Sequence, residues 1–229
     1  MKSGEYELYG DYHIQLDPNW PYLPVYLYKI ALVRNYLELC SATEKILDAG
    51  CGEGVLVREY RERGYDILGM DLNYASEVVM QGSILATGFE DGRFDRVLCL
   101  DVLEHLSFSD QELALAEFAR ILKPEGKLLL SVPNLAHLAS RLSFLLTGKL
   151  VRTSQIERHP GDRPIKEYIQ MIEEHFRIIS RTGIFPTFPL LSLLTLKIPY
   201  RVIGLHRLYN RLFAFPNWCF VNLCFCERK

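Results

Sequence analysis

The stretch Ile46-Leu47-Asp48-Ala49-Gly50-Cys51-Gly52-Glu53-Gly54 decides the fold that the sequence predicts. The residues before it are typical of the end of a short buried strand, and residues 55–63 have a helical composition that ends at Gly64. A strand that turns through three glycines into a helix leaves backbone N–H groups without an intrahelical partner. Such groups bind the negative part of a ligand, and glycines allow that ligand to lie against the backbone. The stretch therefore predicts a ligand site at the carboxyl end of a strand.

The spacing of the glycines indicates which kind of ligand the turn binds. A dinucleotide-binding turn has the pattern G-x-G-x-x-G, whose third glycine lets the helix pack closely on the strand. Here the pattern over residues 50–54 is G-x-G-x-G, and an acid, Asp48, precedes it. A second candidate strand, residues 66–70, is followed by Asp71, about 20 residues past the first glycine, where an acid that binds a ribose is expected. The sequence thus predicts a nucleoside-containing ligand and a turn that differs from the nicotinamide pattern.

Two further blocks complete a resemblance to a known family. Residues 92–106 contain FD-x-V and then EHL, and residues 121–134 contain LKPEG followed by an apolar strand. Together with the glycine turn and Asp71, these blocks resemble the class I S-adenosylmethionine-dependent methyltransferases, most closely the group that includes ubiquinone-pathway O-methyltransferases. The resemblance implies a Rossmann-like α/β fold. Its sheet would be mostly parallel with helices on both faces, an antiparallel last strand and a helical insertion after the fifth strand.

The resemblance also implies S-adenosyl-L-methionine as the cofactor and a set of residues that bind it. Gly50 and Gly52 would let the backbone approach the methionine moiety, and Asp71 would accept hydrogen bonds from both ribose hydroxyls. Ser83 stands where relatives often carry an aspartate that contacts the adenine amino group, so this contact departs from the family pattern. The predicted cofactor-binding residues are Asp48, Ala49, Gly50, Cys51, Gly52, Asp71, Leu72, Ser83, Leu100 and Asp101.

The acceptor side of the predicted site depends on one histidine. Methyl transfer from a sulfonium is an in-line displacement, and a hydroxyl acceptor also needs a base that takes its proton. His105 follows the predicted fourth strand at its carboxyl end, where open α/β sheets bind ligands, and is the candidate catalytic residue. Alternatively, Glu104 and His105 form a structural pair that holds the loop. His137 and His159 are weaker candidates, and no metal site is predicted because the six cysteines lack zinc-ligand spacing.

Length and composition favour a single domain over the 229 residues. Its parts are an N-terminal helical leader (1–44), a cofactor-binding core (45–134) and a substrate-side region with the last two strands (135–229). The aromatic leader packs over the cofactor cleft, as in similar methyltransferases, or covers an edge of the sheet; both interpretations stay open. Met1 is followed by polar and acidic residues, so no signal peptide is expected, and the cysteines fit buried, reduced thiols of a cytoplasmic protein.

Periodicity and caps predict the boundaries of individual elements. Only ten residues separate Asp71 from Gly82, too few for the usual crossover helix, so this crossover is predicted to be truncated. Ser109-Asp110-Gln111-Glu112 has the form of a capping box and predicts the start of a helix. The apolar stripe of that helix would be Leu113, Ala116, Phe118, Ile121 and Leu122. Further helices are predicted over 23–40, over 135–147 and from Pro164, and strands over 78–80, 176–184 and 218–226.

Charge is distributed unequally along the chain. Residues 1–134 carry 12 Lys and Arg against 22 Asp and Glu, whereas residues 135–226 carry 12 against 5. No acid occurs between Glu174 and Glu227. Such an asymmetry indicates an anionic partner for the basic half, and no nucleic acid is expected.

An apolar segment with basic flanks, residues 185–211, lies inside this basic half. The uncharged run over 182–196 is shorter than the about 20 apolar residues that a transmembrane helix needs. Three interpretations stay open. The segment forms core and cleft wall, or it forms a homodimer interface, or it lies on an anionic membrane surface and admits an amphiphilic acceptor. The last interpretation makes the protein peripheral to a membrane.

The sequence therefore predicts an S-adenosylmethionine-dependent methyltransferase that acts on a small or amphiphilic, lipid-like molecule, with in-line transfer to oxygen. Two alternatives stay open. One is an NAD-dependent oxidoreductase, against which the glycine spacing and Asp48 count. The other is a catalytically inactive, methyltransferase-like binding module, which only detection of a product distinguishes.

Overall fold

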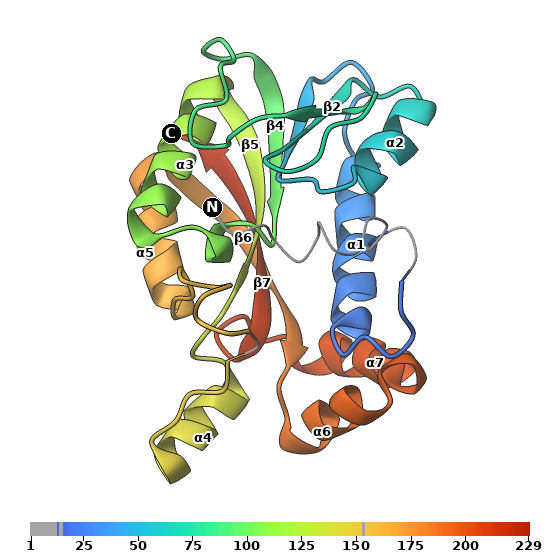
Figure 1. The fold of residues 1–229 in the computed structure, drawn as a ribbon, viewed down its shortest axis with the longest axis vertical. Coiled ribbons are helices and arrows are strands. Elements are labelled where there is room, and N and C mark those ends of the chain that lie inside the picture. Colours follow the sequence, from blue (N-terminus) through green and yellow to red (C-terminus); the bar gives the residue numbers. More distant parts are fainter. Residues whose placement is uncertain (1–12, 14–15, 153) are drawn as a thin grey trace.

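Seven strands form one sheet in the computed structural model, which describes residues 13, 16–152 and 154–229 (Figure 1). The strand order is β3-β2-β1-β4-β5-β7-β6. The strands are β1 (Ile46–Ala49), β2 (Ile67–Asp71), β3 (Val79–Gln81), β4 (Phe94–Leu100), β5 (Leu122–Pro133), β6 (Phe176–Pro186) and β7 (Cys219–Arg228). Strands β1 to β5 pair in parallel, and β7 is antiparallel to both β5 and β6. The carboxyl ends of β1 to β6 therefore lie at one edge, and the predicted fold class is confirmed.

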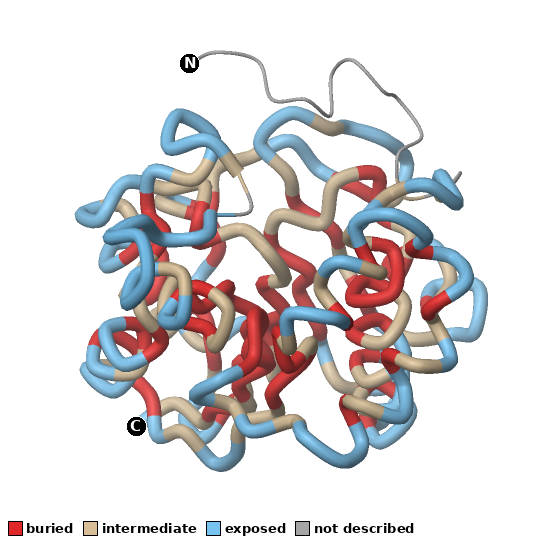
Figure 2. The backbone as a smooth tube through the Cα atoms, turned by 90° about the horizontal axis from the view of Figure 1, so that it is seen from below, coloured by how far each residue is buried: buried red, intermediate tan, exposed pale blue. Residues whose placement is uncertain are grey.

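Helices cover both faces of the sheet. They are α1 (Leu23–Leu37), α2 (Val55–Glu62), α3 (Phe108–Ile121), α4 (Leu138–Thr147), α5 (Ile165–His175), α6 (Pro189–Lys197) and α7 (Ile203–Phe213), with short 3-10 turns at Leu103–His105 and Pro199–Val202. Helices α3 and α5 lie on one face, and α1 and α2 lie on the other. Each pair shares a cluster of buried apolar side chains with the sheet. Figure 2 shows the buried segments in the middle of the molecule, as expected for strands that are covered on both faces.

The crossover between β2 and β3 contains no helix, as its length predicts. Two side chains organise the turn instead. The Asp71 carboxylate accepts hydrogen bonds from the backbone N–H groups of Asn73 and Tyr74, and the Ser76 hydroxyl accepts from those of Val78 and Val79. Short polar side chains that bond to nearby backbone groups are typical of tight turns.

Helix α3 begins earlier than the sequence predicts. Its cap is Ser107, whose hydroxyl accepts a hydrogen bond from the Asp110 backbone N–H, so the predicted cap at Ser109 is wrong. The predicted apolar stripe is also shifted, because Leu113 is 55% exposed. Gln111 takes the inward position, and its side-chain amide donates to the Leu103 and Gly161 carbonyls at 2.8 Å each. A buried glutamine with these partners is invisible to hydrophobic periodicity.

The apolar segment after β6 is helical rather than irregular. Pro186 ends β6 and Pro189 occupies the first turn of α6, so both prolines lie at boundaries where a missing N–H is tolerated. None of the helices in the described part of the chain is long and apolar enough to span a bilayer.

Candidate active site

The turn between β1 and α2 has the backbone conformation that its glycines predict. Gly50 and Gly52 have φ angles of +79° and +53°, which side-chain-bearing residues rarely adopt. A Cβ atom on Gly50 would lie 2.5 Å from the Val102 side chain, so no larger residue fits there. Among the described residues, a Cβ atom on Gly52 would come within 4 Å of the His13 side chain alone, at 3.8 Å. The described residues therefore leave space beside the Gly52 backbone.

Asp71 joins this turn to the end of the neighbouring strand. Its Oδ2 accepts a hydrogen bond of 2.9 Å from the Gly52 backbone N–H, while Oδ1 bonds the turn after β2. Leu72, the next residue, is 42% exposed, and the Ser83 hydroxyl accepts a hydrogen bond from the Leu85 backbone N–H. The structure thus brings the predicted methionine-binding turn and the predicted ribose-binding acid into contact.

Asp48 is a buried acid beneath the glycine turn. It is 4% exposed, and among the described residues its carboxylate has no hydrogen-bond partner. Burial, and then the nearby charge of Asp71, raise the pKa of Asp48 to about 7. A carboxylate in this position favours a positively charged ligand, because such a ligand restores the stabilisation lost with water. This environment suits the sulfonium and amino groups of S-adenosylmethionine.

Asp101 fixes helix α1 to the carboxyl end of β4. Its carboxylate accepts hydrogen bonds from the Tyr22 hydroxyl at 2.9 Å, from the Lys29 ammonium and from the Ser131 hydroxyl. Burial acts to raise the pKa of Asp101, but the Lys29 charge and these hydrogen bonds outweigh it and lower the pKa. Lys29 is itself only 3% exposed. The described part of the leader therefore packs on one face of the sheet and contacts the predicted site at Asp101.

His105 lies in the 3-10 turn after β4, beside His159. Its Nδ1 is 3.0 Å from the Arg158 carbonyl oxygen, which can only accept, so Nδ1 carries the proton and Nε2 has a free lone pair. Burial and the nearby His159 lower the pKa of His105, which keeps the ring neutral near pH 7. The rings of His105 and His159 meet edge to face with centroids 4.7 Å apart. Among the described residues, no hydrogen bond joins the side chains of Glu104 and His105, so the predicted structural pair is not seen.

His137, the third candidate, has both ring nitrogens engaged. Its Nδ1 lies 2.9 Å from the Thr187 hydroxyl, and its Nε2 lies 3.3 Å from the Val151 carbonyl oxygen. Burial lowers the pKa of His137 to about 4. The ring therefore has a structural role at the start of α4, and the geometry leaves His105 as the base candidate.

Comparisons with known proteins identify the family. Residues 25–183 match the family model described as a methyltransferase domain. The chain belongs to the methyltransferase domain family. The prediction of a class I S-adenosylmethionine-dependent methyltransferase is thus confirmed, and the match decides against a nicotinamide-dependent oxidoreductase.

Several relatives of this methyltransferase have named functions or known structures. The ubiquinone biosynthesis O-methyltransferase of Dechloromonas aromatica is 29% identical over 151 residues, covering 58% of this chain and 63% of that protein. The chain spans about half the length of the curated relatives it matches. A crystal structure of a Pyrococcus horikoshii protein covers 100% of both chains, with a TM-score of 0.64 at 16% identity. The structure of Burkholderia thailandensis 1,6-didemethyltoxoflavin-N1-methyltransferase with bound 1,6-didemethyltoxoflavin and S-adenosylhomocysteine covers 98% of this chain and 84% of that one, with a TM-score of 0.57 at 15% identity. At these identities the structural likeness shows the fold.

Some residues at the site of this methyltransferase were not predicted. Tyr22, Lys29 and Ser131 all contact Asp101; Tyr22 and Lys29 lie outside the blocks that carry the family resemblance, and Ser131 lies inside one without having been assigned a role. In the sequence, Lys29 differs from its neighbours only as a charged residue in a broadly apolar helix. A lysine in such a helix can equally well point to solvent, so the sequence does not identify Lys29 as a site residue. Its partner is 72 residues away in sequence.

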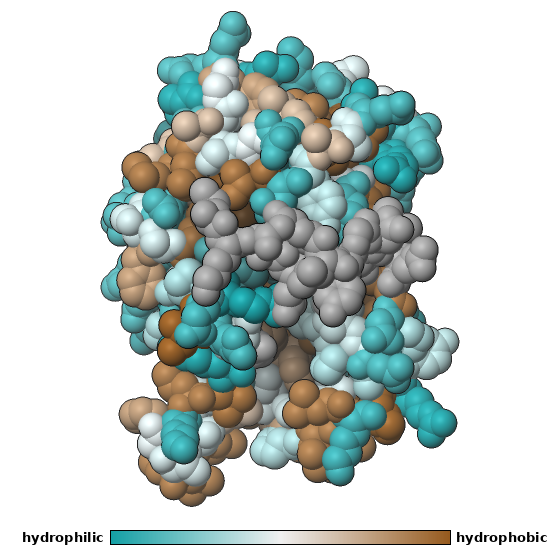
Figure 3. Space-filling model, viewed as in Figure 1, coloured by the Kyte–Doolittle hydropathy of each residue, from teal (hydrophilic) through white to brown (hydrophobic). Residues whose placement is uncertain are grey.

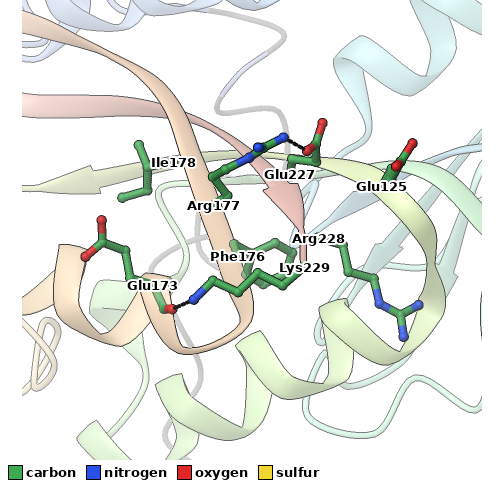
Figure 4. A pocket seen from close by; sticks show the side chains of 8 residues that line it. All are labelled: Glu125, Glu173, Phe176, Arg177, Ile178, Glu227, Arg228 and Lys229. Carbon is green, nitrogen blue, oxygen red and sulfur yellow. Dashed lines mark hydrogen bonds and ion pairs between the residues drawn. The ribbon is translucent and has the colours of Figure 1, made fainter.

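A separate hollow lies at the opposite end of the sheet from the site of this methyltransferase (Figure 4). It lies where β5 and β6 begin and β7 ends, whereas the glycine turn lies at the carboxyl edge. Its charged groups bond mainly to one another, as in the Arg177–Glu227 ion pair. The lining residues are Glu125, Glu173, Phe176, Arg177, Ile178, Glu227, Arg228 and Lys229. The hollow offers no group for methyl transfer.

Proposed function

We propose that this methyltransferase transfers the methyl group of S-adenosylmethionine to an oxygen atom of an amphiphilic small molecule. The observation that carries the choice of oxygen is the free Nε2 lone pair of His105 at the carboxyl end of β4. A hydroxyl acceptor must lose its proton, and a neutral imidazole is suited to take it. The name of the Dechloromonas relative, an O-methyltransferase, supports the same acceptor atom, whereas the Burkholderia enzyme is named for methylation of nitrogen.

The cofactor would lie across the carboxyl ends of β1, β2 and β4. Gly50 lets Val102 pack against the turn, Gly52 would let the methionine moiety approach the backbone, and Asp48 would provide the negative charge that its cationic part needs. Asp71 would accept from the two ribose hydroxyls at the one lone-pair site that its three backbone bonds leave free and at the site that accepts the long bond of 3.3 Å from the Tyr74 backbone N–H. The bound cofactor supplies the reactive methyl carbon, and the protein contributes alignment of donor and acceptor.

A direct test of the acceptor chemistry uses turnover with S-adenosylmethionine and a catechol that carries a prenyl chain. Mass spectrometry should show S-adenosylhomocysteine together with an O-methylated product. His105→Ala should lower turnover by roughly 10²- to 10⁴-fold while the affinity for S-adenosylhomocysteine stays unchanged. His175→Ala, at the end of α5, is the control and should be fully active. Unchanged turnover in His105→Ala, or a product methylated on nitrogen or carbon, would contradict the proposal.

The amphiphilic character of the acceptor is supported by two apolar lobes at the carboxyl edge. The α4 lobe, residues 138–152, follows β5, and the α6–α7 lobe, residues 189–218, follows β6. Figure 3 shows both as largely hydrophobic projections at the bottom of the molecule, with a hollow between them. The exposed apolar side chains of the α4 lobe are Leu142, Phe144, Leu145, Leu146, Leu150 and Val151. Those of the α6–α7 lobe include Leu190, Leu193, Leu196, Leu208, Leu212 and Phe215.

Buried hydrogen bonds hold the α6–α7 lobe in place on its inner side, so its outer side has a fixed conformation. The Thr195 hydroxyl lies 2.6 Å from Nε2 of the buried His206. The Asn210 side chain accepts a hydrogen bond of 2.7 Å from the Phe185 backbone N–H. In α6 only Leu191 and Thr195 are buried, so the interpretation as core holds for the inner side alone.

We propose that both lobes rest on an anionic membrane surface and that the acceptor enters between them. Lys197, Arg201, Arg207 and Arg211 are exposed on the α6–α7 lobe and have no ion pair among the described residues. No acid lies between Glu174 and Glu227 to oppose an anionic surface. Apolar side chains flanked by unpaired cations are typical of proteins that lie on an interface. Apolar side chains that gather on an exposed surface mark a site of contact with a membrane or a partner.

The membrane proposal predicts binding to phosphatidylcholine vesicles only when they contain phosphatidylglycerol. Co-sedimentation should decrease at 1 M salt, where the Debye length is about 3 Å. Replacing the four cations of the α6–α7 lobe by glutamine should weaken binding by about 100-fold or more, since each contributes on the order of 1 kcal/mol. The matched control replaces four exposed cations elsewhere, Lys45, Arg58, Arg61 and Lys166. Failure to bind anionic vesicles at low salt, with a dimer in light scattering, would instead support the homodimer.

A further inference from the structure

We infer that Glu104, His105 and His159 bind one divalent transition-metal ion at the acceptor side of the cleft; this inference rests on the proposed function and adds a second cofactor to it. One ligand atom from each side chain lies within 4.8 Å of the other two. An ion with bonds of about 2.0–2.2 Å closes such a spacing through small side-chain rotations. The sequence predicts no metal site because its cysteines lack zinc-ligand spacing. This cluster contains no cysteine, so that argument does not apply to it.

Glu104 is a buried acid, and one of its two carboxylate oxygens has no hydrogen-bond partner. It is 4% exposed, and its Oε2 makes no hydrogen bond. An unpaired polar atom in a protein interior is unfavourable by about 1–3 kcal/mol, and more when charged. A metal ion at the cluster would provide the missing partner for Oε2.

The two histidines are oriented as metal ligands. The Nδ1–H of His105 donates to the Arg158 carbonyl, which leaves Nε2 free to coordinate; ligating histidines are commonly held by such a second bond. Nδ1 of His159 is buried and has no hydrogen-bond partner. It lies 3.6 Å from Oδ1 of Asp162, a buried oxygen that also makes no hydrogen bond, while the other oxygen, Oδ2, lies 3.6 Å from the Arg152 guanidinium. Asp162 can therefore support His159 or complete the ligand set.

The two segments that carry these ligands are fixed to each other. The backbone N–H of Gly161 donates to the Glu104 carbonyl, and the Gln111 side chain bonds to the carbonyls of both Leu103 and Gly161. A Cβ atom on Gly161 would lie 2.1 Å from the Gln111 amide nitrogen and 2.3 Å from the Leu106 carbonyl oxygen. Only glycine allows the loop to approach this closely, so the cluster is organised before any ion binds.

The ligand types favour zinc, manganese, iron or cobalt over magnesium and calcium. Imidazole nitrogens suit first-row transition metals, whereas magnesium and calcium prefer oxygen ligands. Three protein ligands with open positions are typical of a catalytic site, since structural zinc sites are closed by a fourth ligand. The open positions would take the acceptor hydroxyl.

A bound ion would change how the hydroxyl proton leaves. The coordinated hydroxyl releases its proton to solvent, the O–CH₃ bond forms as the S–CH₃ bond of S-adenosylmethionine breaks, and S-adenosylhomocysteine leaves. His105 then holds the ion and no longer takes the proton itself. Because Val102, which packs against Gly50, lies between Asp101 and the cluster in sequence, the ion would be close to the cofactor turn.

The test titrates Co²⁺ into the EDTA-treated, full-length chain and follows the visible absorption bands of the bound ion. We expect one equivalent to bind and Zn²⁺ to displace it, while excess Mg²⁺ does not. His159→Ala and Glu104→Gln should each weaken Co²⁺ binding by about 100-fold or more, beyond the 10- to 100-fold of second-shell changes. His175→Ala should bind like the wild type. His159→Ala keeps the experiment decisive if Glu104→Gln fails to fold.

The outcomes for the ion and for methyl transfer are separable. Absence of stoichiometric Co²⁺ binding, or equal binding by His159→Ala, would overturn the metal site. Full turnover after EDTA treatment would overturn its catalytic role and leave His105 as the base, with the proposed function intact. Normal Co²⁺ binding without methyl transfer to any hydroxyl acceptor would instead contradict the proposed function.

Discussion

Asp71→Ala is expected to weaken the binding of S-adenosylmethionine more than any other single change at the cofactor turn. Without the carboxylate the cofactor would lose two hydrogen bonds from its ribose hydroxyls. The binding free energy should become less favourable by about 2–4 kcal/mol, which lowers the affinity by roughly 30- to 1000-fold. The same change removes the acceptor for the Gly52 backbone N–H, so the glycine turn also loses a support. Isothermal titration calorimetry with S-adenosylhomocysteine measures the effect.

The control for this change is Asp66→Ala. Asp66 is exposed and precedes β2 at the end of the strand far from the ligand edge. It should bind S-adenosylhomocysteine like the wild type. Wild-type affinity in Asp71→Ala would remove Asp71 from the site, and an equal loss in both variants would indicate a general effect on β2.

Asp48→Asn is expected to raise stability and lower cofactor affinity. The folded-state pKa of Asp48 is about 7 and its ordinary value is 3.8, so the folded chain holds a proton that the unfolded chain releases between these values. Wild-type stability therefore decreases as the pH rises through this window. Asparagine does not titrate, so the variant should gain on the order of 4 kcal/mol relative to wild type above pH 7 and little below pH 4. Losing the carboxylate near the cofactor's cation should weaken binding by roughly 10- to 100-fold.

Urea denaturation without ligand at pH 4 and pH 8 separates the two effects of Asp48→Asn. The difference in the free energy of unfolding between variant and wild type should be much larger at pH 8. An equal difference at both pH values would show that Asp48 does not titrate in this window. Undiminished affinity for S-adenosylmethionine would show that Asp48 does not face the cation.

The cofactor turn could be predicted from sequence because its geometry is local. Glycines at positions 50 and 52 indicate positive φ angles, which the structure has, and Asp71 ends the next strand at the spacing from Gly50 that the sequence pattern predicts. The acceptor side could not be predicted in the same way. His105 and His159 are 54 positions apart in sequence, and tertiary contacts of Gln111, Gly161 and the Arg158 carbonyl bring them together. Tertiary contacts of this kind leave no periodic signal.

The two lobes show a different limit of sequence patterns. The leucines over 135–147 recur at helical spacing, and helix α4 exists, but Leu145 and Leu146 are each 80% exposed. A periodic pattern predicts that a helix has an apolar face. It does not show whether that face meets the core, a partner or a lipid surface, because this depends on what surrounds the helix.

The most direct test of the account is calorimetric titration of the purified chain with S-adenosylmethionine, S-adenosylhomocysteine and NAD⁺. We expect one equivalent of each S-adenosyl compound to bind and no binding of NAD⁺. Tight binding of NAD⁺ without binding of S-adenosylmethionine would contradict it.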